Sequence, residues 1–199
     1  MDAITDISQL DLSKSYTYAD YLSWKFTDLV ELVRGRIVRK VSGPVTAHQR
    51  CSINLGRIID TSLVGQTCQV FAVPFDVRLW RSTGNGDDQI WTVVQPDLCI
   101  ICDPDKIDRR GCLGAPDWVI EIISSRTAVY DTKTKFDLYA ENGVTEYWLV
   151  FPGEQSINTF VLRDGEYQPT GVYDEPGLIP SHTLPSLQVE WASVLAGVA

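Results

Sequence analysis

The chain has 199 residues, of which 44% are hydrophobic and 22% are charged, the composition of an ordinary globular protein with one core. Its formal net charge of −9 argues against broad, charge-driven binding to nucleic acid, which depends on many lysines and arginines. The sequence has no basic and apolar signal segment at its start and no apolar run of about 18 residues, so we expect a cytoplasmic protein outside the membrane. We expect a single domain over residues 1–199, in which residues 1–15 form a polar, peripheral segment.

A short helix and a hairpin come next in the sequence. Residues 16–24 suggest the helix, and LVELVRGRIVRKV over residues 29–41 predicts two strands joined by a tight turn at Gly35. Glu31 interrupts the first of these apolar strands, and an edge position with water nearby is the commoner explanation. The hairpin also carries a local basic patch, for which a charged surface hairpin is at least as good an interpretation: Arg34, Arg36, Arg39 and Lys40.

A longer helix and a β-rich region follow. Apolar residues recur at helical spacing over residues 45–63, which predicts an amphipathic helix with His48 in its first turn. A histidine there is more often a surface or hydrogen-bonded residue than a ligand. Residues 68–80 and 91–102 predict two strands joined by a glycine-rich hairpin loop. Asp97 stands at the entrance to a buried segment, after a proline that fixes the local backbone.

The most informative stretch begins with a strand that contains a misplaced charge. Residues 117–123 are almost continuously apolar, which predicts a strand buried on both faces, yet Glu121 lies at its centre. With side chains alternating at period 2, an ionised carboxylate there must be paired, metal-bound or open to a cleft. Residues 144–151 predict a further buried strand.

The helix between these two strands supplies a candidate partner for the carboxylate. It is predicted over residues 131–142, with Asp131 as its start and Gly143 as its stop. At about 100° per residue, Lys135 lies on the face that turns toward the sheet, whereas Lys133 lies on the solvent face. A strand carboxylate facing a helix lysine is either a structural ion pair or half of an active site.

The rest of the chain adds a hairpin over residues 156–173, with its turn at Asp164 and Gly165, and a terminal strand or short helix within residues 181–197. Together these elements predict an α/β fold, a central mixed sheet flanked by the two long helices. The strands expected in that sheet are residues 68–80, 91–102, 117–123 and 144–151.

The five cysteines are expected to be mainly buried, reduced thiols: Cys51, Cys68, Cys99, Cys102 and Cys112. Cys99 and Cys102 form a CxxC motif, but they lie inside a predicted strand, and the sequence offers no second pair or nearby histidine to complete a zinc site.

Three candidate residues follow one another in this arrangement: Asp97 opens one buried strand, Glu121 lies inside the next, and Lys135 lies on the following helix. Two carboxylates that converge on one point suit a magnesium ion, which takes oxygen ligands. A nearby lysine can orient or help deprotonate a metal-bound water and offset charge on a phosphorane-like transition state. This set of residues is typical of a metal-dependent phosphodiesterase.

The same residues resemble a known family. The pair Asp97 and Glu121, together with the strings QPDL, VIEIIS, DTKTKFDLYAENGVTEYWLV and VELVRGRI, is similar to the Uma family of restriction-type endonucleases, of cyanobacterial type. The resemblance covers about residues 16–165 and implies the PD-(D/E)xK nuclease fold. The wider superfamily has a lysine two residues after the glutamate, where this chain has Ile123; in the Uma pattern the lysine lies on the next helix, at Lys135. Ser125 stands where the family commonly has proline.

The resemblance implies a role for each candidate. Asp97 and Glu121 would bind Mg²⁺ or Mn²⁺, with the carbonyl of Ile122 as a third ligand, and Lys135 would position the attacking water. Glu31 would be an outer ligand or would orient water. For substrate binding the candidates are His48, Arg34 and Arg36.

Three functions remain open at this point. The first is a magnesium-dependent endonuclease that cleaves DNA, acting as a homodimer by analogy with other enzymes of this class. The second is a non-catalytic protein of the same fold that binds nucleic acid or a protein partner, which the acidic charge favours. The third is a purely structural oligomeric α/β protein, in which Glu121 and Lys135 form an ion pair in a closed core.

Overall fold

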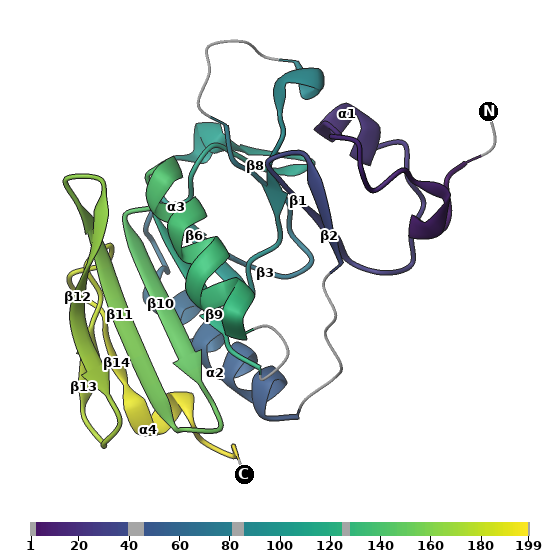
Figure 1. The fold of residues 1–199 in the computed structure, drawn as a ribbon. Helices are drawn as coiled ribbons and strands as arrows, with labels where there is room; N and C mark the ends of the chain where they lie inside the picture. The colour runs from purple at the N-terminus through teal and green to yellow at the C-terminus, as the bar shows by residue number, and fades with distance from the viewer. Residues whose placement is uncertain (1–2, 40–45, 81–85, 125–127, 199) are drawn as a thin grey trace.

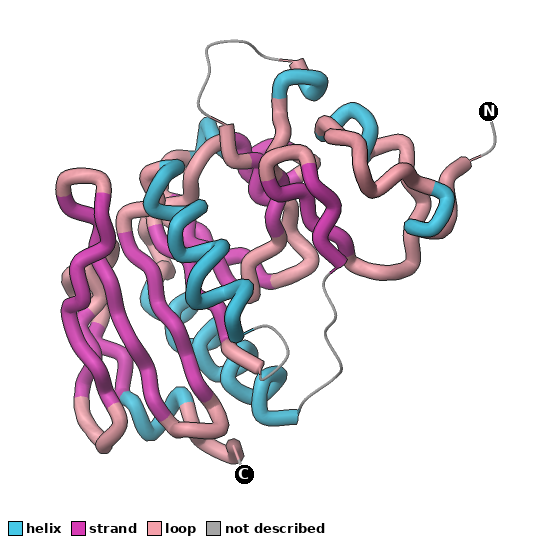
Figure 2. The backbone as a smooth tube through the Cα atoms, in the orientation of Figure 1, coloured by secondary structure: helices cyan, strands magenta, loops and turns pink. Residues whose placement is uncertain are grey.

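The fold is taken from a computed structural model, which describes residues 3–39, 46–80, 86–124 and 128–198. Lys40, the loop residues Gly84 and Asn85, and Ser125 lie outside the described residues. Within these described ranges, the strands form two six-stranded sheets and one two-stranded sheet. Figures 1 and 2 show their arrangement with the helices. The mixed α/β class predicted from the sequence is confirmed.

The first sheet has the strand order β2-β1-β5-β4-β8-β7. Its strands are β1 (Val30–Val33), β2 (Arg36–Arg39), β4 (Val77–Arg78), β5 (Val93–Val94), β7 (Ile107–Asp108) and β8 (Gly111–Leu113). The predicted hairpin is confirmed as β1 and β2, which pair in antiparallel register. Gly35 has a φ of +78° in their turn, a conformation that glycine adopts without steric cost.

The second sheet has the order β12-β11-β10-β9-β6-β3 and is the predicted central mixed sheet. Its strands are β3 (Gln69–Ala72), β6 (Leu98–Ile101), β9 (Trp118–Ile122), β10 (Glu146–Phe151), β11 (Ser156–Arg163) and β12 (Glu166–Tyr173). Strands β9 and β10 are parallel, and the other pairs are antiparallel. The hairpin predicted at residues 156–173 is confirmed as β11 and β12.

Two helices cover opposite faces of this second sheet. Helix α2 (Thr46–Ser62) packs on the face that carries Trp118, Ile120 and Ile122, because all belong to one apolar core. Helix α3 (Phe136–Asn142) packs with Val119 in a second core that also includes strands of the first sheet. The alternation along β9 therefore turns Glu121 toward α3, as its spacing predicts.

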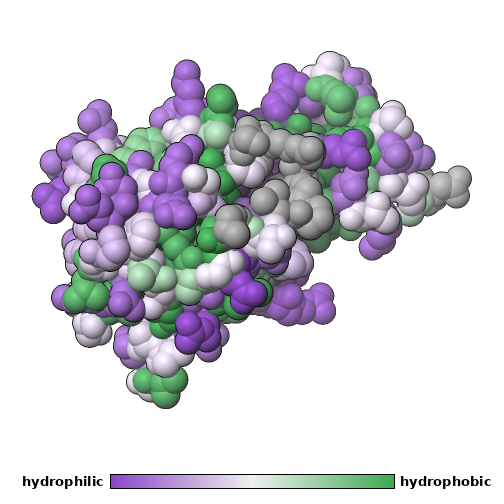
Figure 3. All heavy atoms as spheres, turned by 90° about the horizontal axis from the view of Figure 1, so that it is seen from below, coloured by the Kyte–Doolittle hydropathy of each residue, from purple (hydrophilic) through white to green (hydrophobic). Residues whose placement is uncertain are grey.

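Shorter elements complete the chain. They are η1 (Ile7–Gln9), α1 (Tyr18–Tyr21), η2 (Asp87–Gln89), η3 (Pro104–Lys106), the π-helical turn η4 (Tyr130–Lys135), β13 (Leu178–Pro180), β14 (Gln188–Glu190) and α4 (Trp191–Val194). The terminal stretch thus contains both a strand and a short helix. The N-terminal segment bridges Ile4 to Trp24 and packs in a third, smaller core. On the face seen in Figure 3, hydrophobic residues are interspersed among hydrophilic ones.

The prediction of two long strands at residues 68–80 and 91–102 is wrong. Each is two strands in different sheets: β3 and β6 pair in the second sheet, whereas β4 and β5 pair in the first. Pro74 and Pro96 lie at the two crossings, and a proline has no N–H to continue a ladder of hydrogen bonds. These crossings carry the chain from one sheet to the other beside Asp97.

The prediction of reduced thiols is wrong for two of the five cysteines. Cys68 and Cys102 form a disulfide. They flank the antiparallel pair Gln69 and Ile101 at the ends of β3 and β6, so the strand register places them opposite each other. Cys51, Cys99 and Cys112 are free and buried, as expected.

No helix among the described residues is long and apolar enough to cross a membrane.

Candidate active site

Glu121 and Lys135 meet where β9 faces the helix that follows it. The Nζ atom of Lys135 donates to Oε1 of Glu121 at 2.8 Å, and the hydroxyl of Tyr139 donates to the same oxygen at 2.8 Å. Both charged side chains are only 1% exposed. Lys133, two residues earlier, is exposed. The helical periodicity therefore assigned the two lysines to the correct faces.

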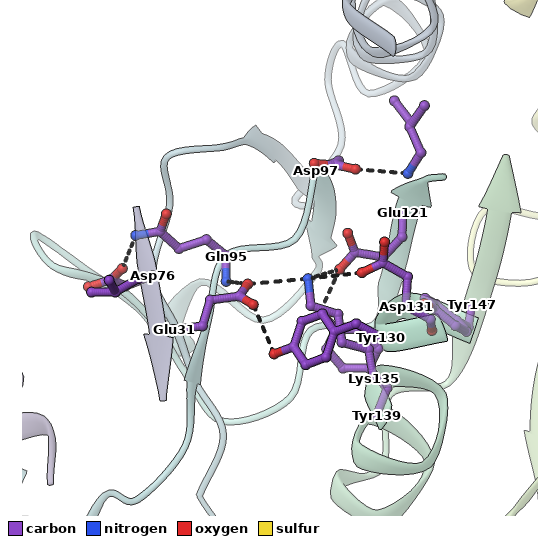
Figure 4. Close-up of polar contacts among 12 residues, drawn as sticks. Glu31, Asp76, Gln95, Asp97, Glu121, Tyr130, Asp131, Lys135, Tyr139 and Tyr147 are labelled. Atoms are coloured by element: carbon purple, nitrogen blue, oxygen red, sulfur yellow. Dashed lines mark hydrogen bonds and ion pairs between the residues drawn. The ribbon is translucent and has the colours of Figure 1, made fainter. Parts of the chain in front are cut away.

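Glu31 reaches the same lysine from the other sheet (Figure 4). Its Oε1 lies 3.2 Å from Nζ of Lys135 and accepts the backbone N–H of Gln95 at 2.7 Å, while its Oε2 accepts the hydroxyl of Tyr130 at 2.9 Å. Glu31 is fully buried, with no exposed surface. The interpretation of an edge position with water nearby is wrong, because β1 lies between β2 and β5.

Asp131 is a third carboxylate beside Lys135. Its Oδ1 lies 3.7 Å from Nζ, one turn earlier in the helical segment. The prediction that Asp131 starts the helix is wrong: helical residues precede it from Ala128, and Asp131 is buried inside the π-helical turn. The stop at Gly143 is confirmed, with a left-handed φ of 84°. One ammonium group therefore has three carboxylates around it, from β1, β9 and η4.

The protonation of Lys135 follows from this surrounding. Burial alone would lower its pKa, but the nearby carboxylates of Glu121, Glu31 and Asp131 outweigh burial and raise the pKa well above its ordinary value. Lys135 is therefore a cation at neutral pH. It can donate hydrogen bonds and offset negative charge, but it cannot serve as a general base.

A second polar group forms around Asp97 at the crossing between the sheets. Its Oδ2 accepts the backbone N–H of Ile122 at 2.8 Å and lies 3.1 Å from Nε2 of His48, which is in the first turn of α2. The side chain of Asp97 is 4% exposed and that of His48 is 19% exposed. Asp97 thus joins α2 to the residue that follows Glu121.

The polar contacts also extend away from the lysine toward the first sheet. The side chain of Gln95 donates through Nε2 to Oδ1 of Asp76 at 2.8 Å and to the hydroxyl of Tyr21 at 3.2 Å. Burial, followed by the charge of Asp76, raises the pKa of the Tyr21 hydroxyl, so Tyr21 is a neutral donor. Gln95 therefore connects this cluster to Glu31 through its own backbone.

The predicted substrate-binding arginines lie further away. Arg34, in the β1–β2 turn, pairs with Glu141 on α3 at 2.5 Å. Arg36 donates through Nη1 to three carbonyl groups of the N-terminal segment, those of Leu12, Ser13 and Lys14. Arg39 of the same basic patch pairs with Asp28. Each described arginine of the patch thus already has partners within the chain.

The donor set can be tested against a divalent cation. Three carboxylates lie 2.8–3.7 Å from the ammonium group of Lys135 in a buried volume. Hard oxygen ligands suit Mg²⁺ or Mn²⁺. Among the described residues, no group of three or more His, Cys, Asp or Glu side chains stands ready in a metal-binding arrangement. The described carboxylates fit such an ion by ligand type, but they are not arranged as a formed metal site.

Comparison with known proteins places this chain in a family. Residues 18–194 match the Uma2 family, whose description is "Putative restriction endonuclease". The chain belongs to the Uma2 family. A relative is the uncharacterized protein slr1290 of Synechocystis sp., which is 27% identical over 153 residues, 73% of each chain.

The fold of this Uma2 chain also has a solved counterpart. A crystal structure of a "putative nuclease belonging to DUF820" from Anabaena variabilis superposes with a TM-score of 0.73. The two sequences are 18% identical, and the match covers 92% of this chain and 99% of the other. The likeness confirms the nuclease-like fold.

Several residues of the candidate site were not singled out from the sequence. Tyr130 and Tyr139 each hold a carboxylate oxygen, and Gln95 holds Glu31 through its backbone. Tyr139 lies four residues after Lys135, so helical spacing could have found it. Gln95 could not be found that way, because its role depends on the pairing of β1 with β5.

Proposed function

We propose that this Uma2 protein is a divalent-metal-dependent endonuclease that hydrolyses phosphodiester bonds of DNA. The observation that carries the proposal is the convergence of Glu31, Glu121 and Asp131 on the single cation Lys135, with Asp97 at the neighbouring strand entrance. A structural ion pair needs one carboxylate, and each further buried carboxylate is costly unless another cation compensates it. The family description and the nuclease-like fold support the same conclusion.

In this proposal Asp97 and Glu121 would hold Mg²⁺ or Mn²⁺, with the carbonyl of Ile122 as a further ligand. The bound ion supplies Lewis acidity toward a phosphate oxygen. Lys135 stays protonated, so it would orient the attacking water and offset the charge that develops on the phosphate. Glu31 is fixed by Tyr130 and the Gln95 amide and would keep Lys135 in place.

The three predicted substrate-binding residues differ in how readily they could contact DNA: His48, Arg34 and Arg36. His48 lies at the Asp97 carboxylate and its side chain is 19% exposed, so it would face the substrate. Arg34 and Arg36 would have to exchange partners that they hold within the chain. A homodimer with one site for each DNA strand is part of the proposal, and light scattering on the purified protein would test it.

A specific observation favours a second candidate, a non-catalytic nuclease-fold protein that binds nucleic acid or a protein partner. Glu31, Glu121 and Lys135 are no more than 1% exposed, as a closed structural cluster would be. In that case the cluster would stabilise the contact between the two sheets and would bind no metal.

The test is a calorimetric titration of Mg²⁺ and Mn²⁺ into the wild type, Asp97→Asn and Glu121→Gln, with Asp137→Asn as the matched control on an exposed helix position. Nicking of a supercoiled plasmid is then measured with the same proteins and with Lys135→Met. The proposal expects metal binding and nicking in the wild type and Asp137→Asn, metal binding lost in both site carboxylate variants, and nicking lost in all three site variants. Absence of metal binding in a folded wild type would refute it and leave the non-catalytic candidate.

A further inference from the structure

A cavity of about 380 Å³ lies beside the candidate active site, between the β1–β2 turn, the neighbouring β4 and β5 region and α3. Its apolar lining includes Trp80, Trp91 and Leu138, and its polar lining includes Arg34, Gln89 and Glu141. The volume falls within the range of small-ligand sites, about 300–1,000 Å³. The cavity has no role in the chemistry assigned to Lys135 and its carboxylates.

The lining has the chemistry that recognises a flat, polar-edged ring. Trp91 is 45% exposed, an unusual position for a large indole without a binding partner. The backbone carbonyl of Trp91 accepts the N–H of Gly35 at 2.6 Å, which fixes the residue against the β1–β2 turn. An indole has only two side-chain torsions to order, so it gives a stacking surface at a low cost in conformational entropy.

The charge of the cavity lining favours a nucleobase over a phosphate group as its occupant. Among the described lining residues, Arg34 and Glu141 are the only charged ones, and they pair with each other at 2.5 Å, so this described lining has no formal net charge. A phosphate would find no unpaired cation among these residues. A nucleobase is uncharged, stacks on indole rings, and presents edge donors and acceptors that suit Gln89 and the Arg34–Glu141 pair.

The position of the cavity links it to the proposed reaction. Leu138 and Glu141 follow Lys135 on α3 by three and six residues, which corresponds to about 4.5 and 9 Å along a helix axis. Arg34 follows Glu31 by three residues, about 10 Å along an extended chain. At about 3.4 Å per nucleotide in a stacked strand, these distances place the cavity one to three nucleotides from the lysine.

We propose that this cavity holds one unpaired base of single-stranded DNA, stacked on Trp91, while the strand continues over one to three nucleotides toward the candidate active site. The inference rests on the proposed nuclease function and narrows its substrate to DNA with a single-stranded or base-extruded segment. Base stacking also supplies affinity that an acidic protein cannot obtain from phosphate contacts alone. The Arg34–Glu141 pair would contact the base edge.

The proposal is tested by fluorescence anisotropy with labelled oligonucleotides in EDTA, so that no cleavage occurs. Three probes of one length are compared: single-stranded DNA, the same strand with abasic sites, and the blunt duplex. The variants are Trp91→Ala and Trp91→Phe, with Leu178→Ala as the control because Leu178 is also exposed, at 58%, on distant β13. Urea unfolding of each variant verifies that it is folded.

We expect the wild type to bind the single strand more tightly than either other probe. Trp91→Ala should weaken that binding about 5- to 150-fold, the range measured for base stacking on aromatic side chains. Trp91→Phe should retain most of the affinity, and Leu178→Ala should equal the wild type. Equal affinity of Trp91→Ala and the wild type, or equal binding of the abasic strand, would overturn the proposal.

Cleavage of the labelled single strand in Mg²⁺ separates this inference from the function on which it rests. Cleavage by the wild type together with binding that does not depend on Trp91 would refute the base site and leave the nuclease intact. Trp91-dependent binding without cleavage of either the single strand or a plasmid would support the base site and refute the catalytic proposal. Indole and amide side chains also suit sugars, so binding to an oligosaccharide array that is lost in Trp91→Ala, with DNA binding unchanged, would overturn the assignment to DNA.

Discussion

Replacing Lys135 by methionine tests whether one buried cation holds the carboxylate cluster together. The substitution keeps most of the side-chain volume and removes the ammonium group from contact with Glu121 at 2.8 Å, Glu31 at 3.2 Å and Asp131 at 3.7 Å. Removing one partner of a buried ion pair costs about 3–5 kcal/mol, because the remaining charge has no compensation. Three carboxylates share this cation, so we expect Lys135→Met to lie at the upper end of that range.

The magnitude can be measured without loss of the folded state. Domains of this kind have a free energy of unfolding of about 5–15 kcal/mol, so a loss of about 5 kcal/mol leaves most such proteins folded in water. Urea unfolding, monitored by tryptophan fluorescence, gives the difference in free energy of unfolding between the variant and the wild type from the midpoint and slope of each curve. Lys133→Met is the matched control: Lys133 is exposed in the same helical segment, and its replacement should change stability by no more than about 0.5 kcal/mol.

A double variant identifies the cause of the loss. Adding Glu121→Gln to Lys135→Met removes one of the uncompensated charges, so the double variant should be more stable than the sum of the two single losses by about 0.5–3 kcal/mol. The reasoning is refuted if Lys135→Met costs no more than Lys133→Met, or if the two site substitutions are additive. Either result would mean that the ammonium group is not the charge partner of these carboxylates.

Further predictions concern the turn, the core and alkaline pH. Gly35→Ala should lower the free energy of unfolding by more than about 1 kcal/mol, since φ is +78° and an added Cβ would lie 3.0 Å from Ser15. Gly65 has a similar φ of +81° but open space around it, so Gly65→Ala should lower the free energy of unfolding by less, as measured by urea unfolding. Leu55→Ala should cost about 2–5 kcal/mol by the same assay, because Leu55 is fully buried. Burial, with the charge of Asp76, raises the pKa of Tyr18 from 10.0 to about 12. The contribution of neutral Tyr18 to stability is therefore complete below pH 10.0 and is lost as the pH rises toward 12. Urea midpoints measured across that pH interval would detect the loss.

The parts of the fold that the sequence predicted are those fixed by local periodicity. Alternation at period 2 placed Glu121 on the face opposite Trp118, and helical spacing turned Lys135 toward it. Turn residues correctly located both hairpins, whose turns contain Gly35 and Gly165. In each case the information lies within about ten neighbouring residues.

The parts that the sequence did not predict depend on contacts between distant segments. The runs at residues 68–80 and 91–102 are predominantly apolar along their whole length, so hydrophobicity gives no sign that they cross between sheets, although Pro74 and Pro96 mark the crossings. The disulfide of Cys68 and Cys102 likewise depends on the register of β3 with β6. Local patterns cannot report a register that two separate strands establish together.

The failures at the candidate site have a common physical origin. Glu31 was interpreted as an exposed edge residue and Asp131 as a helix cap, which are the ordinary roles of acidic residues at such positions. Both are instead buried against Lys135, where local propensity and desolvation oppose them. A sequence that departs from local rules without a gain in packing does so most often at functional sites. The two misinterpreted residues and the correctly predicted pair form one cluster, and the cost of that cluster is the physical reason to look for its function there.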